Sequence, residues 1–254
     1  MEQEYSVLVE AVRAAGAAIL DVQKAGITIT RKDNNDVLTE ADLLANEVLK
    51  THLQDAFPDY GWLSEETVDN PNRLHKRKVW VVDPIDGTRE FATGVPEYAV
   101  SVALVEQGLV TLAAVFNPET DELFTAIRGQ GAFLNEKPIQ CRQICQGQLV
   151  LLASRSECKR GEWERFSEEQ VKPIGSIAYK LALVAAGFAD ATFSLGPKNE
   201  WDIAAGVLLV SEAGGVVTDV MRQPFVFNRP DVLVNGIVAS SCPSARRVMA
   251  TIAA

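Results

Sequence analysis

The segment from Val79 to Phe91, VWVVDPIDGTREF, constrains the fold more than any other part of the chain. Its first four residues are apolar and mostly β-branched, which is typical of a short buried strand. Pro84 cannot donate a ladder hydrogen bond and Gly87 permits unusual backbone angles, so we expect the strand to break into a turn at Asp83. Two carboxylates, Asp83 and Asp86, are costly at the end of a buried strand unless something pairs them. A divalent cation such as Mg²⁺, which prefers oxygen ligands, would do so.

Other interpretations of this turn fit the spacing to different degrees. A solvated turn is the simplest, because Asp and Gly are common together in turns. A calcium loop of the EF-hand type requires a Glu at its twelfth position, where counting from Asp83 gives Gly94, so that interpretation fails. A phosphatase with an aspartyl nucleophile, of the haloacid dehalogenase type, would carry Asp-x-Asp-x-Thr after its strand. The spacing Asp-x-x-Asp-Gly-Thr weakens this interpretation too.

Composition narrows the class of protein. The chain has 254 residues, of which 47% are hydrophobic and 23% charged, which is typical of a globular protein with a substantial core. No apolar run approaches the length of a membrane span, and the acidic N-terminus is unlike a secretory or mitochondrial signal. A net charge of −10 argues against a nucleic-acid polymer as partner, although bound cations would still allow a small anionic substrate. We expect a cytoplasmic protein without a membrane partner.

The cysteines and histidines do not predict a disulfide framework or a zinc site. The four cysteines are few and scattered, and the chain has only two histidines. Free thiols in a reducing cytosol are the simplest expectation. A redox role for Cys141 and Cys145 stays open.

The apolar pattern predicts an α+β half that ends near residue 148. Helices are expected over 4–25 and from Thr39 to about Phe57, and residues 68–78 should form an exposed loop. A turn is expected over 32–36, and strands over 27–31, 60–63, 79–82, 99–106, 109–116, 122–127 and 129–134.

Residues 149–254 predict an α/β half, and the absence of a linker suggests that both halves form one compact unit. Strands are expected over 149–153, 189–194, 216–219 and 237–240. Helices are expected over 158–170, 176–187, 201–213 and 243–253.

Four further acidic residues, in three segments of the chain, each have a structural and a functional interpretation. Asp42 follows Thr39 by three residues, as in a helix capping box. Glu65 and Glu66 resemble a solvated surface pair, but they follow an apolar strand. Asp202 lies in the first turn of a helix, where an acid complements the helix dipole. Small residues follow it at once, which allows close approach of a ligand.

The segment Trp80–Thr88 resembles the WxxDPxDGT signature of the inositol monophosphatase superfamily, which includes fructose-1,6-bisphosphatases and 3′(2′),5′-bisphosphate nucleotidases. Other parts of the chain agree with the superfamily's patterns, from about Asp36 to Gly215. They are L-T-E-A-D ending at Asp42, S-E-E at Ser64–Glu66, W-D-I-A-A-G at Trp201–Gly206, and E-A-G-G at Glu212–Gly215.

The resemblance implies a layered αβαβα sandwich of the inositol monophosphatase and fructose-1,6-bisphosphatase type. It also implies a Mg²⁺-dependent, Li⁺-sensitive phosphomonoesterase with two or three Mg²⁺ per active site, acting as a monomer or homodimer. In the superfamily, the residue at Asp42 hydrogen-bonds the Thr of the DGT turn, here Thr88. The metal ligands that it implies are Glu65, Asp83, the carbonyl of Ile85, Asp86 and Asp202.

Carboxylates without a nearby Cys or Ser–His arrangement favour metal-activated water over a covalent intermediate. We therefore expect in-line hydrolysis of a phosphate monoester, with Glu65, Thr88 and Asp42 as the catalytic residues that position and deprotonate the water. If Thr88 begins a helix, N–H groups of Gly87 and Thr88 should receive phosphate oxygens. The residues expected to bind substrate are Ile85, Asp86, Gly87, Thr88, Ser176, Lys180 and Asp202.

The substrate is less strongly indicated. Inositol-specific relatives carry a Glu seven residues before the motif Asp, where this chain has Leu195. Lys180 is expected either to meet a second phosphate or to be an ordinary surface lysine. Segments that resemble the bisphosphate nucleotidase branch are Leu63–Glu66, Gly87–Phe91, Ser154–Ser156 and Gly196–Pro197.

We therefore expect 3′-phosphoadenosine 5′-phosphate as the first substrate, hydrolysed to AMP and phosphate. Inositol 1-phosphate comes second and fructose 1,6-bisphosphate third. A catalytically silent metal- or nucleotide-binding protein is the alternative from a different class.

Overall fold

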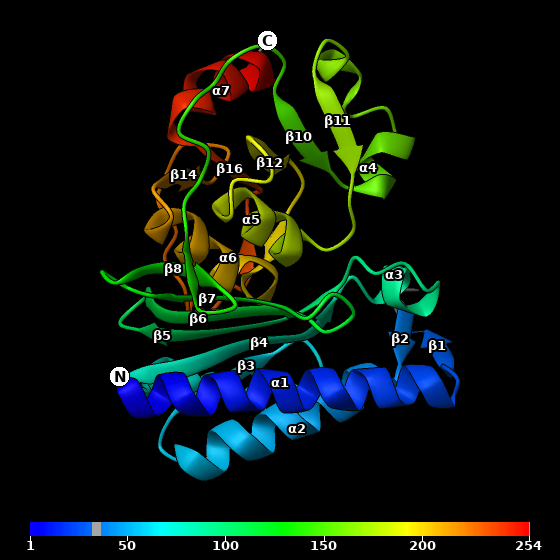
Figure 1. Ribbon diagram of the computed structural model, residues 1–254. Coiled ribbons are helices and arrows are strands. Elements are labelled where there is room, and N and C mark those ends of the chain that lie inside the picture. The colour runs from blue at the N-terminus through cyan, green and yellow to red at the C-terminus, as the bar shows by residue number, and fades with distance from the viewer. Residues whose placement is uncertain (32–36, 254) are drawn as a thin grey trace.

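The computed structural model describes residues 1–31 and 37–253, and helices and sheets alternate in it as layers (Figure 1). The helices α1 (Glu2–Ala25) and α2 (Glu40–Ala56) cover one face of a large sheet. Two more, α5 (Ile177–Ala185) and α6 (Glu200–Glu212), lie between this sheet and a smaller one. The short helices α4 (Arg155–Lys159) and α7 (Ala245–Ala253) lie beyond the smaller sheet. This order confirms the predicted αβαβα sandwich.

The large sheet has seven strands in the order β3-β4-β5-β6-β7-β8-β9. The pair β3 and β4 is parallel and the other pairs are antiparallel, so the carboxyl ends of β3 and β4 meet at one edge. The strands are β3 (Gly61–Ser64), β4 (Lys78–Asp86), β5 (Ala99–Glu106), β6 (Leu109–Asn117), β7 (Glu122–Ile127), β8 (Gly131–Leu134) and β9 (Lys137–Ile139).

The smaller sheet is mixed, with the order β11-β10-β12-β16-β14. Its strands are β10 (Val150–Ala153), β11 (Gln170–Pro173), β12 (Ala191–Ser194), β14 (Gly215–Thr218) and β16 (Ile237–Ser241). Two antiparallel pairs lie outside both sheets: β1 (Ile29–Arg31) with β2 (Val37–Thr39), and β13 (Lys198–Asn199) with β15 (Leu233–Val234).

The apolar run in β4 is explained by burial of both faces of the large sheet. Trp80 and Val82 belong to the core beneath α1 and α2. Val79 and Val81 belong to the core that contains α5 and α6. The core that contains α5 and α6 includes residues from both before and after position 148. The division of the chain into two halves at that position stays a prediction.

The predicted break at Asp83 is wrong in detail, because β4 continues to Asp86 through a bulge. Asp83 is paired with Ser101 and Asp86 with Ala99, so β4 carries one extra residue between them. A bulge accommodates Pro84, which has no N–H to donate. The turn follows at Gly87, whose φ of +97° suits glycine, and α3 (Thr88–Ala92) begins at the next residue.

Two other predictions are corrected. The expected helix over 158–170 is not formed: α4 ends at Lys159, and the 3₁₀ helix η2 (Glu164–Phe166) and strand β11 follow. The expected exposed loop over 68–78 contains the 3₁₀ helix η1 (Pro71–His75), in which Arg73 is buried. The turn expected over 32–36 lies outside the described residues. In the described part of the chain, every helix is too short or too polar to traverse a lipid bilayer.

Candidate active site

Three of the predicted metal ligands meet at one edge of the large sheet. Carboxylate oxygens of Glu65, Asp83 and Asp202 lie within 4.8 Å of one another. Glu65 directly follows β3, and its N–H donates to the carbonyl of Val82 over 3.2 Å, next to Asp83. The parallel pairing of β3 and β4 therefore brings Glu65 and Asp83 together although the strands are separated in sequence.

Asp202 reaches this edge from the first turn of α6. Its Oδ2 accepts the N–H of Asn199 over 2.8 Å, and the two residues form a capping box. The position expected from the sequence to complement the helix dipole thus also caps the helix, and the same carboxylate lies beside Glu65 and Asp83.

In the absence of a cation, burial and mutual repulsion raise the pKa values of Asp83 and Asp202. Asp83 is 1% exposed, and its pKa is raised by burial and then by the negative charges of Glu65, Asp86 and Asp202. Burial, followed by the charge of Asp86, raises the pKa of Asp202 to about 8. A hard divalent cation with oxygen ligands suits this donor set, so the residues present fit Mg²⁺.

Asp86 joins the turn after β4 to the start of α5. Its Oδ2 accepts the hydroxyl of Ser176 and the N–H of Ala178, both over 2.6 Å. Burial raises the pKa of Asp86, although these hydrogen bonds and the positive charges of Lys180 and Lys198 oppose the shift. Ser176, expected at the substrate, thus also positions Asp86.

Asp42 and Thr88 are in direct contact. Oδ1 of Asp42 accepts the hydroxyl of Thr88 over 2.9 Å, and Oδ2 accepts the N–H and hydroxyl of Thr39 over 2.7 and 2.6 Å. The Thr88 hydroxyl also lies 3.0 Å from the carbonyl oxygen of Ile85. Both interpretations of Asp42, as a helix cap and as the partner of Thr88, are therefore found together.

One cavity of about 360 Å³ contains the remaining predicted residues. Asp42 does not line it, but Asp42 accepts a hydrogen bond from Thr88, which does. The predicted residues that line it are Glu65, Asp83, Ile85, Asp86, Gly87, Thr88, Ser176, Lys180 and Asp202. Other charged or hydroxyl-bearing residues, which the sequence does not predict at the site, also line the cavity: Arg89, Glu90, Ser154, Ser156, Glu157, Ser194 and Lys198.

Lys180 is buried against the cavity rather than lying at the molecular surface. Its side chain comes from α5, the residue is 3% exposed, and Nζ donates to the carbonyl of Ile174 over 3.3 Å. Burial lowers its pKa to about 8, although the charges of Glu157 and Asp86 oppose this. An ammonium group held in this way provides a binding position for an anion.

Two of the missed residues left a signal in the sequence. Lys198 lies four residues before Asp202, within the segment that carries the Asp motif. Glu157 forms a capping box with Ser154, a spacing that marks the start of α4. Glu157 also accepts the hydroxyl of Ser194 over 2.6 Å and the indole N–H of Trp163 over 3.2 Å.

The cysteines lie outside this cavity, and all four are free. Cys141 is buried, and burial raises the pKa of its thiol to about 11. A thiolate is the reactive form, so this environment disfavours reactivity at Cys141.

Comparison with known proteins agrees with this fold. A family model described as the inositol monophosphatase family matches residues 1–254. The Nus factor SuhB of Xylella fastidiosa is 39% identical over 84% of this chain and 81% of its own length. The inositol-1-monophosphatase of Mesorhizobium japonicum is 35% identical over 92% of this chain and 90% of its own.

Solved structures give the same result. An inositol monophosphatase (IMPase) from Thermotoga maritima superposes with a TM-score of 0.87 at 27% identity, covering 100% of this chain and 97% of its own. The extragenic suppressor protein suhB of Bartonella henselae gives 0.84 at 30% identity, covering 97% of each chain. With a family model over its whole length, this chain belongs to the inositol monophosphatase family.

Proposed function

We propose that this phosphatase hydrolyses phosphate monoesters with Mg²⁺ and that its preferred substrate is 3′-phosphoadenosine 5′-phosphate. The observation that carries the proposal is one cavity with the carboxylates Glu65, Asp83 and Asp202 and, on the α5 side, the buried ammonium group of Lys180. Such a cavity suits a substrate with a reacting phosphate near the carboxylates and a second anionic group near the lysine.

The residues that would hold Mg²⁺ are Glu65, Asp83, Asp86, Asp202 and the carbonyl of Ile85. Bound there, Mg²⁺ would supply Lewis-acid activation of a water and of the phosphate group. Asp83 is the central member of the proposed ligands, because its carboxylate lies within 4.8 Å of those of Glu65 and Asp202 and the charge of Asp86 also raises its pKa.

Thr88 and Asp42 would orient the attacking water. The Thr88 hydroxyl donates to Asp42 over 2.9 Å, so its oxygen lone pairs are left to accept a hydrogen bond from water. Glu65, beside Asp83 in the cavity, would then take the proton as general base.

Positive charge in the cavity supports a substrate with two phosphates. Lys180 and Lys198 line the same cavity. Leu195 occupies the position where inositol-specific relatives carry a Glu for sugar hydroxyls. Its side chain is apolar and does not line this cavity. We propose that Lys180 binds the second phosphate, as a charge-assisted contact.

Inositol 1-phosphate is the second candidate, because the relative from Mesorhizobium japonicum is named an inositol-1-monophosphatase. The discriminating experiment measures phosphate release with Mg²⁺ from 3′-phosphoadenosine 5′-phosphate, inositol 1-phosphate and fructose 1,6-bisphosphate. A kcat/KM highest for the first supports the proposal, and a kcat/KM highest for the second replaces it. No release from any substrate would favour a catalytically silent binding protein.

Two further properties belong to the same proposal. Li⁺ should inhibit by displacing Mg²⁺, and phosphate release with increasing LiCl tests this. We also propose a cytoplasmic location, which the four free cysteines support.

A further inference from the structure

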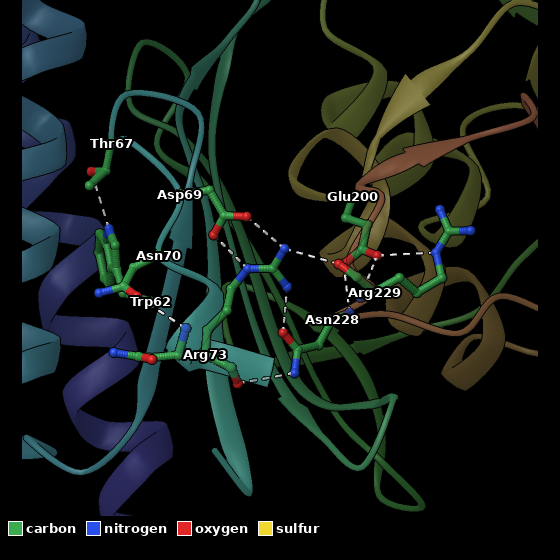
Figure 2. Close-up of polar contacts among 9 residues, drawn as sticks. Trp62, Thr67, Asp69, Asn70, Arg73, Glu200, Asn228 and Arg229 are labelled. Carbon is green, nitrogen blue, oxygen red and sulfur yellow. Dashed lines mark hydrogen bonds and ion pairs between the residues drawn. The ribbon is translucent and has the colours of Figure 1, made fainter. Parts of the chain in front are cut away.

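A buried arginine joins the loop after Glu65 to a distant segment of the chain (Figure 2). Arg73 is 2% exposed, and its Nε and Nη2 donate to the two carboxylate oxygens of Asp69 over 2.7 and 2.9 Å. Its Nη1 donates to the side-chain oxygen of Asn228 over 2.6 Å, and Nη2 donates to the carbonyl of Arg229 over 2.9 Å. The planar guanidinium thus spans two segments more than 150 residues apart in sequence.

The segment at Asn228 is in turn held by the first residue of α6. Glu200 is fully buried, and its carboxylate accepts the backbone N–H groups of Asn228 and Arg229 over 2.6 and 3.0 Å. The Nε of Arg229 donates to the same carboxylate over 3.3 Å. Arg73, Asn228, Arg229 and Glu200 together form a polar bridge. Figure 2 shows Arg73 and Glu200 at its two ends, on opposite sides of Asn228.

Both ends of the bridge lie close to metal ligands in the sequence. Asp69 follows Glu65 by four residues, and Glu200 precedes Asp202 by two residues. Arg73 also packs against β3, because a Cβ on Gly61 would lie 3.1 Å from the Cβ of Arg73. The bridge therefore connects the strand that presents Glu65 to the helix turn that presents Asp202.

Such a connection matters because the carboxylates repel one another before a cation binds. A rigid support holds them at the separation that the cation requires, which lowers the cost of binding. We propose that Arg73 is a positioning residue that, through Asn228 and Glu200, fixes Asp202 relative to Glu65 and so strengthens Mg²⁺ binding. The inference rests on the proposed function for the identity of the metal ligands.

Arg73→Lys tests the proposal, because it keeps the charge and loses the planar contact to two segments. We expect the Kd for Mg²⁺, measured by calorimetry on metal-free protein, to rise about tenfold. The kcat at saturating Mg²⁺ should change less than about twofold, since the bound cation restores the arrangement. Glu200→Gln, which weakens the other end of the bridge, should raise the same Kd and serves if Arg73→Lys does not fold.

Arg142→Lys is the matched control. Arg142 donates to the carboxylate of Asp190 over 2.8 Å and to the carbonyls of Gly187 and Phe188 over 3.0 and 2.9 Å. None of these residues lines the candidate active site. This variant should lower the melting temperature of the metal-free protein without changing the Kd for Mg²⁺.

Two outcomes separate the inference from the proposed function. An unchanged Kd in Arg73→Lys and Glu200→Gln, with a lowered melting temperature alone, would show a purely structural bridge and overturn the inference. Wild-type protein that binds Mg²⁺ without hydrolysing any phosphomonoester would overturn the proposed function, while a raised Kd in the variants would still support the positioning role.

Discussion

The hydroxyl of Thr88 lies 2.9 Å from Oδ1 of Asp42, across 46 positions of sequence. Asp42 is 1% exposed, and its other oxygen is occupied by Thr39. A buried carboxylate with both oxygens engaged holds the Thr88 side chain in one rotamer, at the edge of the cavity that also contains Glu65 and Asp83.

Thr88→Val should lower kcat about 100-fold, because it removes a group that orients the attacking water. It should also lower the free energy of unfolding by about 1–3 kcal/mol, because Oδ1 of Asp42 loses a buried hydrogen bond. Phosphate-release kinetics and thermal unfolding measure the two effects.

Thr88→Ser should keep most activity. Thr93→Val, which removes the hydroxyl bonded to the carbonyl of Arg89 at the end of α3, should keep kcat unchanged. Full activity in Thr88→Val would contradict the assigned role.

Asp83→Asn should abolish measurable turnover and leave the protein folded. The amide cannot supply the negative charge that a divalent cation requires, and Asp83 lies among Glu65, Asp86 and Asp202. Because the substitution removes repulsion in the metal-free protein, its melting temperature in EDTA should rise above that of the wild type. Asp55→Asn, on the exposed side of α2, is the control and should change neither quantity. Retained phosphate release in Asp83→Asn would contradict the proposed metal site.

Much of the fold follows from local patterns in the sequence. The apolar runs of β5 and β6 are joined by Gln107 and Gly108, both with positive φ, so the hairpin is predicted by composition and turn chemistry together. The error over 158–170 has a tertiary cause. Trp163 and Phe166, three residues apart, resemble one face of a helix, yet both pack against Phe193 of β12.

Some residues at and around the candidate site could likewise be identified from the sequence, and others could not. Asp83 and Asp86 could be identified because a strand, a proline and a glycine fix them in one short segment. Arg73 could not, since most residues of the segment 68–78 are polar, as in a solvated loop, and its partner Asn228 lies 155 residues away. Only the folded chain brings these two residues together.

The stability of the metal-free protein should fall as pH rises from about 4 to 8. The pKa of Asp202 is raised to about 8 in the folded chain, from 3.8 for an ordinary Asp, so the folded state binds more protons than the unfolded state in this window. Unfolding then becomes less costly as pH rises, because the proton must leave a buried carboxyl. Melting temperatures in EDTA at pH 5, 6, 7 and 8 measure this trend.

Added Mg²⁺ should reverse that trend, since the cation requires the ionised carboxyls. The increase in melting temperature caused by a fixed Mg²⁺ concentration should therefore grow between pH 5 and pH 8. Asp202→Asn, which cannot ionise, is the control and should show a flatter dependence in EDTA. An Mg²⁺ effect that is the same at all four pH values would contradict the proposed coupling of metal and proton binding.

Lys180→Met should change substrate preference more than it changes the chemical step. Methionine keeps the unbranched apolar shape but removes the ammonium group, which is buried beside the cavity and has Ile174 as its hydrogen-bond acceptor. A hydrogen bond to a charged group contributes about 1.5–3 kcal/mol, which corresponds to a loss of about 10- to 150-fold in kcat/KM for a substrate with a second phosphate. For inositol 1-phosphate, which has only the reacting phosphate, kcat/KM should change less than about threefold.

Lys180→Arg keeps the charge and should retain part of the preference. Burial lowers the pKa of Lys180 to about 8, so the preference of the wild type should also weaken above that pH as the side chain loses its proton. Equal losses for both substrates in Lys180→Met would place Lys180 at the reacting phosphate or in the supporting structure, and would remove the main argument for a bisphosphate substrate.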